Sequence, residues 1–368
     1  MAAHARRLGI DHVIVGEPMG FWRTHMPNGM FLRSDCDWHL DPGNTFTIRA
    51  YLDEQQLQPA DVEPLSLERY LAYARWFMAR ARIEPWPVMV ERLDGGESGF
   101  RATLEGGGTI EARRVVLAPG FAHFAHVPED LRQVLPAARV RHTCEFVDFS
   151  RVAGERWLIV GGRQSAFEWA ALMREAGAAA VHVSHRHDSP KFAVSDWSWV
   201  GPLVEGMGDN PGWFRRLTEP EKEEIRRRLW SEGRLKLEPW LERRVVGDGI
   251  TLWPNTRVES SYELPGGSLQ VRLVSAGADN QLEVDGVVMA TGYKPDISRV
   301  PLLARGNILS TLQVDQGLPA LDNYLQTSLP GLFITSMPAT AAFGPFFAFT
   351  VSARVSATLI GRALTGTT

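Results

Sequence analysis

The residues best suited to bind a cofactor lie between Ile159 and Ala166, where the chain reads IVGGRQSA. We expect a buried apolar strand to end there in a glycine turn that opens a helix, which is the setting of a dinucleotide-binding motif. Gly161 would allow the tight turn, and Ala166 would let the helix pack close to the sheet. The free N–H groups at the start of the helix would then face a pyrophosphate. The candidate residues of this turn are Gly161, Gly162, Arg163, Gln164, Ser165 and Ala166.

Two arginines near this turn could bind phosphate groups, and one of them would favour NADP over NAD. Arg163 replaces the second glycine of a GxGxxA pattern, and its side chain could cover a phosphate as a cation. An ordinary strand-to-helix turn is the alternative. About 20 residues further on, the next strand ends in His185, Arg186 and His187. An acid there would suit NAD, whereas Arg186 offers a bidentate fork for the 2′-phosphate of NADP; a solvated strand end is the alternative.

The cysteines, histidines and serines of the sequence predict no disulfide, metal site or catalytic nucleophile. Cys36 and Cys144 are far apart, so we expect two buried thiols rather than a disulfide framework, a redox pair or a zinc site. His123, His126 and His142 have no acid or cysteine at metal-ligand spacing, so no metal is expected. No GxSxG nucleophile motif occurs in the sequence.

Composition excludes several classes of protein. The chain has 368 residues, of which 44% are hydrophobic and 22% charged, and its formal charge is −4. These values are typical of a globular protein of two or three domains and exclude a disordered chain. A slightly acidic chain gives no electrostatic reason to expect nucleic acid or an anionic membrane as a partner. No apolar run reaches the ~18 residues of a membrane helix and no signal peptide is evident, so we expect a cytoplasmic protein.

Strands and helices alternate along the chain, which predicts an α/β fold with parallel sheets and two nucleotide-binding units. The stretch 190–248 differs, because it combines five tryptophans with a charged helix. We expect the charged helix to present a solvated face and the tryptophans to be core residues; an aromatic substrate pocket is the alternative. We expect His39 and its neighbouring aspartates to form a polar loop. Strands are expected at 12–15, 86–92, 99–104, 109–118, 156–162, 179–185 and 331–335, and helices at 66–82, at 165–175 and up to Leu364.

A third motif, at residues 289–296, resembles one found in a known protein family. After the strand VDGVV, residues 289–296 read MATGYKPD and resemble the ATGY motif of the flavin-dependent monooxygenases with two dinucleotide-binding domains. These are the flavin-containing monooxygenases and the N-hydroxylating monooxygenases of lysine and ornithine. The LAPG of 117–120 is similar to that family's first crossover between domains, and 161–166 is similar to its GxGxSA motif apart from Arg163. Other segments resemble those beside the family's flavin: Phe21–Trp22, Gly29–Met30, Leu32, Gly331–Phe333 and Phe343–Pro345.

The resemblance implies two Rossmann-like domains. A discontinuous FAD domain would comprise residues 1–150 and 290–368, and an NADPH domain, residues 151–289, would carry the Trp-rich insertion of about 190–248. The implied chemistry is that NADPH reduces FAD, the reduced flavin takes up O2, and a flavin (hydro)peroxide transfers one oxygen atom to a small molecule, so no catalytic side chain is expected. The implied flavin-site residues are Trp22, Met30, Leu32, Ala118, Gly120, Ala290, Thr291, Gly292, Tyr293, Phe343, Gly344 and Pro345.

The beginning of the chain departs from this family. Residues 1–8 read as the end of a helix, whereas the family has a strand and a GxGxxG turn ahead of that helix, which is ~15–20 more residues. Glu17 stands where an acid would bind the adenosine ribose of FAD; a surface turn residue is the alternative.

Three interpretations of function follow. The first is an FAD- and NADPH-dependent monooxygenase, and the second is an NADPH-dependent flavin reductase or oxidase without oxygen transfer. The third is a truncated or degenerate homologue that is not catalytic and does not retain FAD. A disulfide reductase is not expected, because the chain has no CxxC dithiol. The substrate is open among amines, thioethers, ketones and small aromatics, and so is the question of a homo-oligomer.

Overall fold

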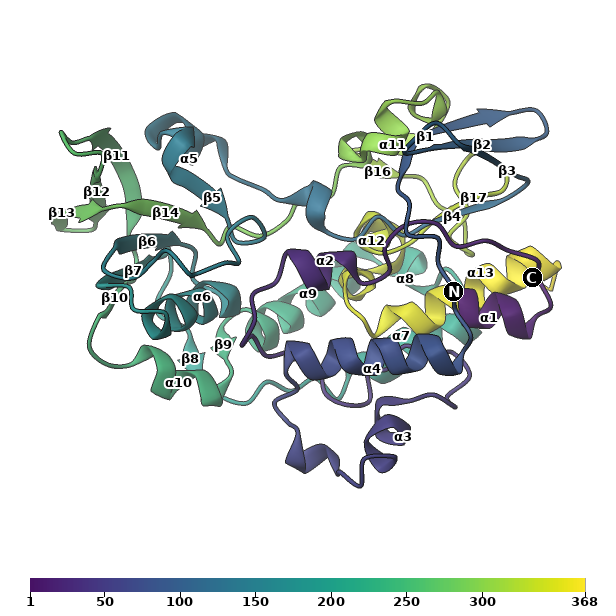
Figure 1. The fold of residues 1–368 in the computed structure, drawn as a ribbon, viewed down its shortest axis with the longest axis horizontal. Coiled ribbons are helices and arrows are strands. Elements are labelled where there is room, and N and C mark those ends of the chain that lie inside the picture. The colour runs from purple at the N-terminus through teal and green to yellow at the C-terminus, as the bar shows by residue number, and fades with distance from the viewer. Residues whose placement is uncertain (368) are drawn as a thin grey trace.

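A five-stranded parallel sheet forms one lobe of the molecule (Figure 1). The computed structural model describes residues 1–367. The strand order is β10 (Ile250–Trp253), β7 (Ala180–Ser184), β6 (Arg156–Val160), β14 (Gly286–Met289) and β5 (Val140–His142). Its central strands are apolar because both faces of the sheet are covered. Helices α6 (Gln164–Glu175) and α10 (Pro239–Val245) pack on one face, and α5 (Glu129–Val134) with the antiparallel strands β11 (Arg257–Glu263), β12 (Leu269–Ser275) and β13 (Ala278–Val284) packs on the other.

The first dinucleotide motif is built as its sequence predicts. Strand β6 ends at Val160, the turn follows, and α6 runs from Gln164 to Glu175 before β7 begins. The strands expected at 156–162 and 179–185 and the helix expected at 165–175 are therefore confirmed within two residues at each end. Because β5 pairs with β14, the chain already enters this sheet before residue 150.

The second lobe contains a three-stranded antiparallel sheet and a pair of parallel strands (Figure 1). The first comprises β1 (Val90–Gly96), β2 (Gly99–Leu104) and β3 (Thr109–Ala112), and the second comprises β4 (Val115–Leu117) and β17 (Leu332–Ile334). The single strand expected at 109–118 is wrong, since the chain breaks at 113–114 and its two halves join different sheets. The strand expected at 86–92 begins only at Val90.

The strand expected at 12–15 is reduced to one parallel bridge between Val15 and Trp86. The N–H of Gly16 donates to Trp86 and the N–H of Trp86 donates to Ile14, at 3.0 and 2.8 Å. These bonds use one edge of the segment, and β4 likewise uses one edge to pair with β17. Residues 12–15 and β4 both line the cavity described below.

Helices that are far apart in the sequence pack together in this second lobe. Helix α1 (Ala2–Arg7) packs on α13 (Ser352–Thr365), and α4 (Leu67–Arg80) begins at the capping hydroxyl of Ser66. Helix α7 (Val200–Asp209), from the Trp-rich insertion, also packs on α13. The insertion therefore contributes to the core of the second lobe. None of the helices in residues 1–367 has the length and apolar character needed to cross a bilayer.

The other helices and strands are short or belong to the insertion. They are α2 (Gly20–Thr24), α3 (Ile48–Asp53), α8 (Trp213–Arg216), α9 (Glu219–Gly233), α11 (Pro301–Ala304), α12 (Thr340–Phe343), β8 (Lys191–Phe192), β9 (Lys236–Leu237), β15 (Val314–Asp315) and β16 (Leu318–Pro319).

Candidate functional site

A cavity of about 2030 Å³ lies between the two lobes, and most of the candidate residues line it. Its lining comes from the glycine turn after β6, from the segments after β4 and β14, and from the chain around residues 15–32. The candidates that line it are Glu17, Trp22, Met30, Leu32, Ala118, Gly120, Gly161, Gly162, Arg163, Gln164, Ser165, Arg186, Ala290, Thr291, Gly292, Tyr293 and Pro345.

Three candidates lie elsewhere. Ala166 is fully buried between α6 and the sheet, as its expected packing role requires. Phe343 is 1% exposed in the core of the second lobe, and a Cβ on Gly344 would lie 2.9 Å from the ring of Phe214. The interpretation of Phe343 and Gly344 as flavin-facing residues is therefore corrected: they pack against other side chains, and only Pro345 of that motif reaches the cavity.

The glycines of the β6–α6 turn allow close approach of neighbouring strands. Gly161 has φ +148°, and a Cβ there would lie 2.4 Å from the carbonyl oxygen of Ala290. A Cβ on Gly162 would lie 2.5 Å from the side chain of His185. The first turn of α6 carries no acid, so its free N–H groups have no carboxylate of their own helix to neutralise them.

The same turn has polar groups and cations that lack partners. Nε2 of Gln164 and Nε2 of His185 are buried without a hydrogen bond among the described residues. Arg163, Arg186 and Arg234 line the cavity, and no carboxylate of residues 1–367 forms an ion pair with them. Burial, and then the charge of Arg186, lowers the pKa of Arg163. These groups fit the phosphates of NADPH, which would supply the missing negative charge.

The sequence assigns the 2′-phosphate of NADPH to Arg186, and this assignment can be tested directly. Arg186→Ala is expected to raise the KM for NADPH roughly 10- to 100-fold, since a charge-assisted hydrogen bond to phosphate is lost. The KM for NADH should stay nearly unchanged, because NADH has no such phosphate. Steady-state kinetics with both nucleotides measures the two values, and equal increases would contradict the assignment.

The two segments that cross between the lobes are hydrogen-bonded to each other. The N–H of His126 donates to Gly292 at 3.0 Å, and the N–H of Lys294 donates to Phe124 at 2.8 Å. The backbone of Gly120 and Gly292 is left-handed, with φ +67° and +80°, and a Cβ at either position would meet no atom within 4 Å. Both glycines line the cavity, so the backbone leaves room there for a ligand to approach closely.

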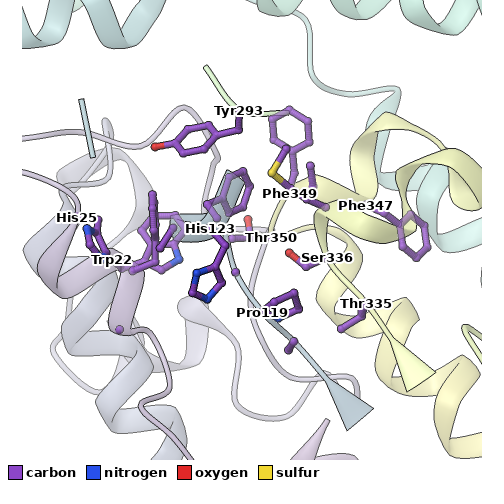
Figure 2. Close-up of a pocket in the computed structure, with 18 of the residues that line it drawn as sticks. Trp22, His25, Pro119, His123, Tyr293, Thr335, Ser336, Phe347, Phe349 and Thr350 are labelled. Carbon is purple, nitrogen blue, oxygen red and sulfur yellow. The ribbon is translucent and has the colours of Figure 1, made fainter. Parts of the chain in front are cut away.

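An aromatic pocket forms the other end of the cavity, where the resemblance places the flavin ring (Figure 2). Trp22 and His25 lie on one side of the pocket, and Phe347 and Phe349 lie on the other. His123 lies between them, and burial, followed by the charge of Arg299, lowers the pKa of its imidazole. A ring that is neutral at pH 7 can accept a hydrogen bond from a ligand.

Sequence reasoning did not single out several residues of this pocket. They are His25, Thr335, Ser336, Phe349 and Thr350, and His123 was considered only as a metal ligand. Ser336 has φ +70°, an uncommon conformation for a residue with a Cβ, directly at the cavity wall. They come from the end of α2 (His25), from the segment after β4 (His123) and from the segment between β17 and α13 (the other four). The TSMP of 335–338 has no periodicity that would have marked it.

One buried acid connects the two lobes. Glu168 of α6 is fully buried, and its Oε1 accepts the N–H of Phe31 at 2.9 Å, while Oε2 has no partner among the described residues. Burial raises the pKa of this carboxyl to about 8. The bond fixes the segment that carries Met30 and Leu32, which is the segment expected beside the flavin. Glu168 was not recognised from the sequence.

The described residues fit the ring system of FAD. The aromatic pocket and the open glycine backbone suit a flat ring system. Glu17 lines the cavity but also lies 3.3 Å from the guanidinium of Arg23, so its role toward the ribose stays a prediction.

The weaker candidates have structural partners. Asp41 accepts the N–H groups of Gly43, Thr45 and Phe46, and pairs with Arg7 at 2.7 Å, so it holds the polar loop together. No group of acids, histidines and cysteines in residues 1–367 is arranged to hold a metal. Both cysteines are buried and free, and they form no dithiol. Among the tryptophans of the insertion, Trp197 and Trp230 line the cavity, whereas Trp199, Trp213 and Trp240 pack against core residues.

Solved structures share this architecture. The ornithine N-hydroxylase of Kutzneria sp. 744 superposes with a TM-score of 0.80, is 15% identical, and is matched over 99% of this chain and 96% of its own. The ornithine hydroxylase of Pseudomonas aeruginosa superposes with a TM-score of 0.75 at 17% identity, over 99% and 95% of the two chains. At these identities the likeness confirms the α/β fold.

Two comparisons concern the sequence itself. The FAD-dependent urate hydroxylase of Xanthomonas campestris pv. campestris is 26% identical over 346 residues, which is 88% of this chain and 69% of that protein. The sequence model of the pyridine nucleotide-disulphide oxidoreductases matches residues 1–207, more than half of the chain. The cofactors expected from the motifs, FAD and NADPH, agree with both matches. The protein therefore belongs to the pyridine nucleotide-disulphide oxidoreductase family and is an NAD(P)H-dependent flavoprotein.

Proposed function

We propose that this protein is a monooxygenase that uses NADPH and O2 to place one oxygen atom in a small molecule. The observation that carries the proposal is the shape of the cavity, which runs without interruption from the β6–α6 turn to the aromatic pocket. A nicotinamide dinucleotide on the turn could thus reach a flavin in the pocket. Bound FAD would accept a hydride from NADPH and activate O2. The reaction balances as substrate, NADPH, H⁺ and O2 giving oxygenated substrate, NADP⁺ and water.

The residues of this chain would serve to position the reactants and exclude water. Phe21, Phe121 and Tyr293 contact one another, with ring centroids 5.3 to 6.0 Å apart. Such an apolar wall keeps water from the reacting atoms, which favours oxygen transfer over loss of the reducing equivalents. The chain has no dithiol, so it lacks the group that a disulfide reductase places beside its flavin.

The aromatic lining favours a planar substrate. Trp38, Trp197 and Phe349 form edge-to-face pairs at 6.2 and 6.5 Å, and all three line the cavity. Flat rings pack well on such walls. Urate is the named substrate of one sequence relative and ornithine that of one structural neighbour, so these two molecules are the first probes.

The proposal is tested with the full chain, FAD and NADPH under ¹⁸O2. Mass spectrometry should show one ¹⁸O atom in the product, with one NADPH consumed for each product formed. We expect planar heteroaromatic compounds such as urate to react in preference to ornithine. NADPH consumption that yields only hydrogen peroxide with every compound would assign the protein as an oxidase. A protein that stays colourless after addition of FAD would exclude flavin catalysis by this chain.

A further inference from the structure

The end of helix α9 places a further cation, Arg234, on the wall of the cavity. Arg234 caps α9 and lines the same cavity as Arg163, which caps the start of α6. The two residues are 71 positions apart in sequence and come from different parts of the chain. Burial, followed by the charges of Arg163 and Arg33, lowers the pKa of Arg234 to about 10. Like charges are thus gathered at this wall of the cavity.

The acids near Arg234 are already engaged. Glu232 pairs with Lys236 at 2.6 Å, and Glu238 pairs with Arg33 at 2.8 Å. Arg33 also donates to the carbonyl oxygen of Gly233, so its guanidinium is fully used in holding the end of α9. Arg234 makes no side-chain hydrogen bond to the described residues, and its charge faces the cavity without a counter-ion. Cations left unpaired in a cavity wall are suited to an anionic ligand.

An aromatic side chain holds Arg163 toward α9. The guanidinium carbon of Arg163 lies 4.6 Å from the ring centroid of Trp230, one turn before Arg234 on the same helix. Trp230 is 44% exposed, so one part of its ring is free of core packing and the guanidinium of Arg163 lies over it. The contact holds the guanidinium of Arg163 against α9, the helix that Arg234 caps. The two arginines thus line one cavity from two parts of the chain, the dinucleotide turn and the insertion.

We propose that Arg163 and Arg234, with Trp230 supporting Arg163, clamp the phosphate groups of NADPH between α6 and α9. The inference rests on the proposed function, since NADPH is the reductant of that reaction. It adds a phosphate contact from the Trp-rich insertion to those of the dinucleotide turn. A carboxylate on the substrate has the same anionic chemistry, and the experiment below separates the two sources.

The test measures binding of NADP⁺ to the full chain by isothermal titration calorimetry, which requires no turnover. Arg234→Gln is expected to raise the Kd roughly 10- to 100-fold, and Arg234→Lys to raise it less, since charge remains but the fork is lost. Trp230→Leu should raise it roughly 3-fold, because only the support of Arg163 is removed. Arg227→Gln is the matched control: Arg227 lies on the same helix, is exposed and pairs with Glu224, so the Kd should not change.

The remaining readouts distinguish the clamp from its alternatives. The thermal midpoint of Arg234→Gln should equal or exceed that of the wild type, because one of several repelling cations is removed. An unchanged Kd for NADP⁺ overturns the clamp, and a raised KM for the substrate alongside it would identify a substrate carboxylate as the ligand. If the wild type binds NADP⁺ through Arg234 but forms no oxygenated product, the clamp stands and the proposed function fails. A wild-type chain that binds no NADP⁺ would overturn both.

Discussion

Gly161→Ala is expected to abolish the use of NADPH while the protein keeps any bound flavin. The added Cβ would lie 2.4 Å from the carbonyl oxygen of Ala290, and the φ of +148° is unfavourable for alanine. The turn must therefore move away from β14, and the start of α6, where we expect the phosphates of NADPH to bind, moves with it. A displacement of about 1 Å at a cofactor site costs on the order of 100-fold in rate. We expect at least that loss in kcat/KM for NADPH, measured by anaerobic bleaching of the flavin spectrum.

Gly154→Ala provides the control for this prediction. Gly154 has φ +77° in the turn before β6, but a Cβ there would meet no atom within 4 Å. The substitution should cost about 1–2 kcal/mol of stability through the left-handed backbone alone and leave the kinetics unchanged. If Gly161→Ala released the flavin and left NADPH binding intact, the two cofactor sites would have to be exchanged.

The parts of the site that depend on local sequence could be predicted. A strand, a glycine turn and a helix follow one another within 156–175, and each has its own signal in composition and periodicity. The crossovers at 117–120 and 290–293 were recognised from their resemblance to the motifs of a known family, and both line the cavity. The geometry of a motif that is contiguous in sequence depends mainly on its own residues and little on how the rest of the chain packs.

The parts that depend on long-range packing could not be predicted. Nothing near Arg113 indicates that β3 and β4 belong to different sheets, because both halves have the same β propensity. The contact between Phe214 and Gly344 joins the insertion to the C-terminal segment, and no local pattern reveals it. Arg234 follows a run of charged residues that reads as a solvated helix, yet it faces the cavity because α9 ends there. Glu168 looks like an ordinary helix residue until the fold buries it against Phe31.

Glu168→Gln is expected to stabilise the protein above neutral pH. Burial raises the pKa of this carboxyl from its usual 4.5 to about 8, although the hydrogen bond from Phe31 and the charges of Arg244 and Arg33 oppose the rise. The folded state therefore holds the proton more tightly than the unfolded state, so stability is lost as pH rises from about 4.5 to about 8. Glutamine has no proton to lose, and its amide oxygen can still accept the N–H of Phe31. The difference in unfolding free energy should reach about 4–5 kcal/mol above pH 8.

Denaturant unfolding of both proteins between pH 5 and 9 measures this difference, because the other titrating groups are shared and cancel. The exposed turn residue Glu97 offers a control, and the curve of Glu97→Gln should run parallel to that of the wild type. Curves for Glu168→Gln that also ran parallel would mean that the carboxyl is charged in the folded protein. Glu168→Leu separates stability from function, since it too removes the buried acid but leaves the N–H of Phe31 without its acceptor. We therefore expect it to lower the rate of flavin reduction even where glutamine does not, because the segment that carries Met30 and Leu32 loses the bond that ties it to α6.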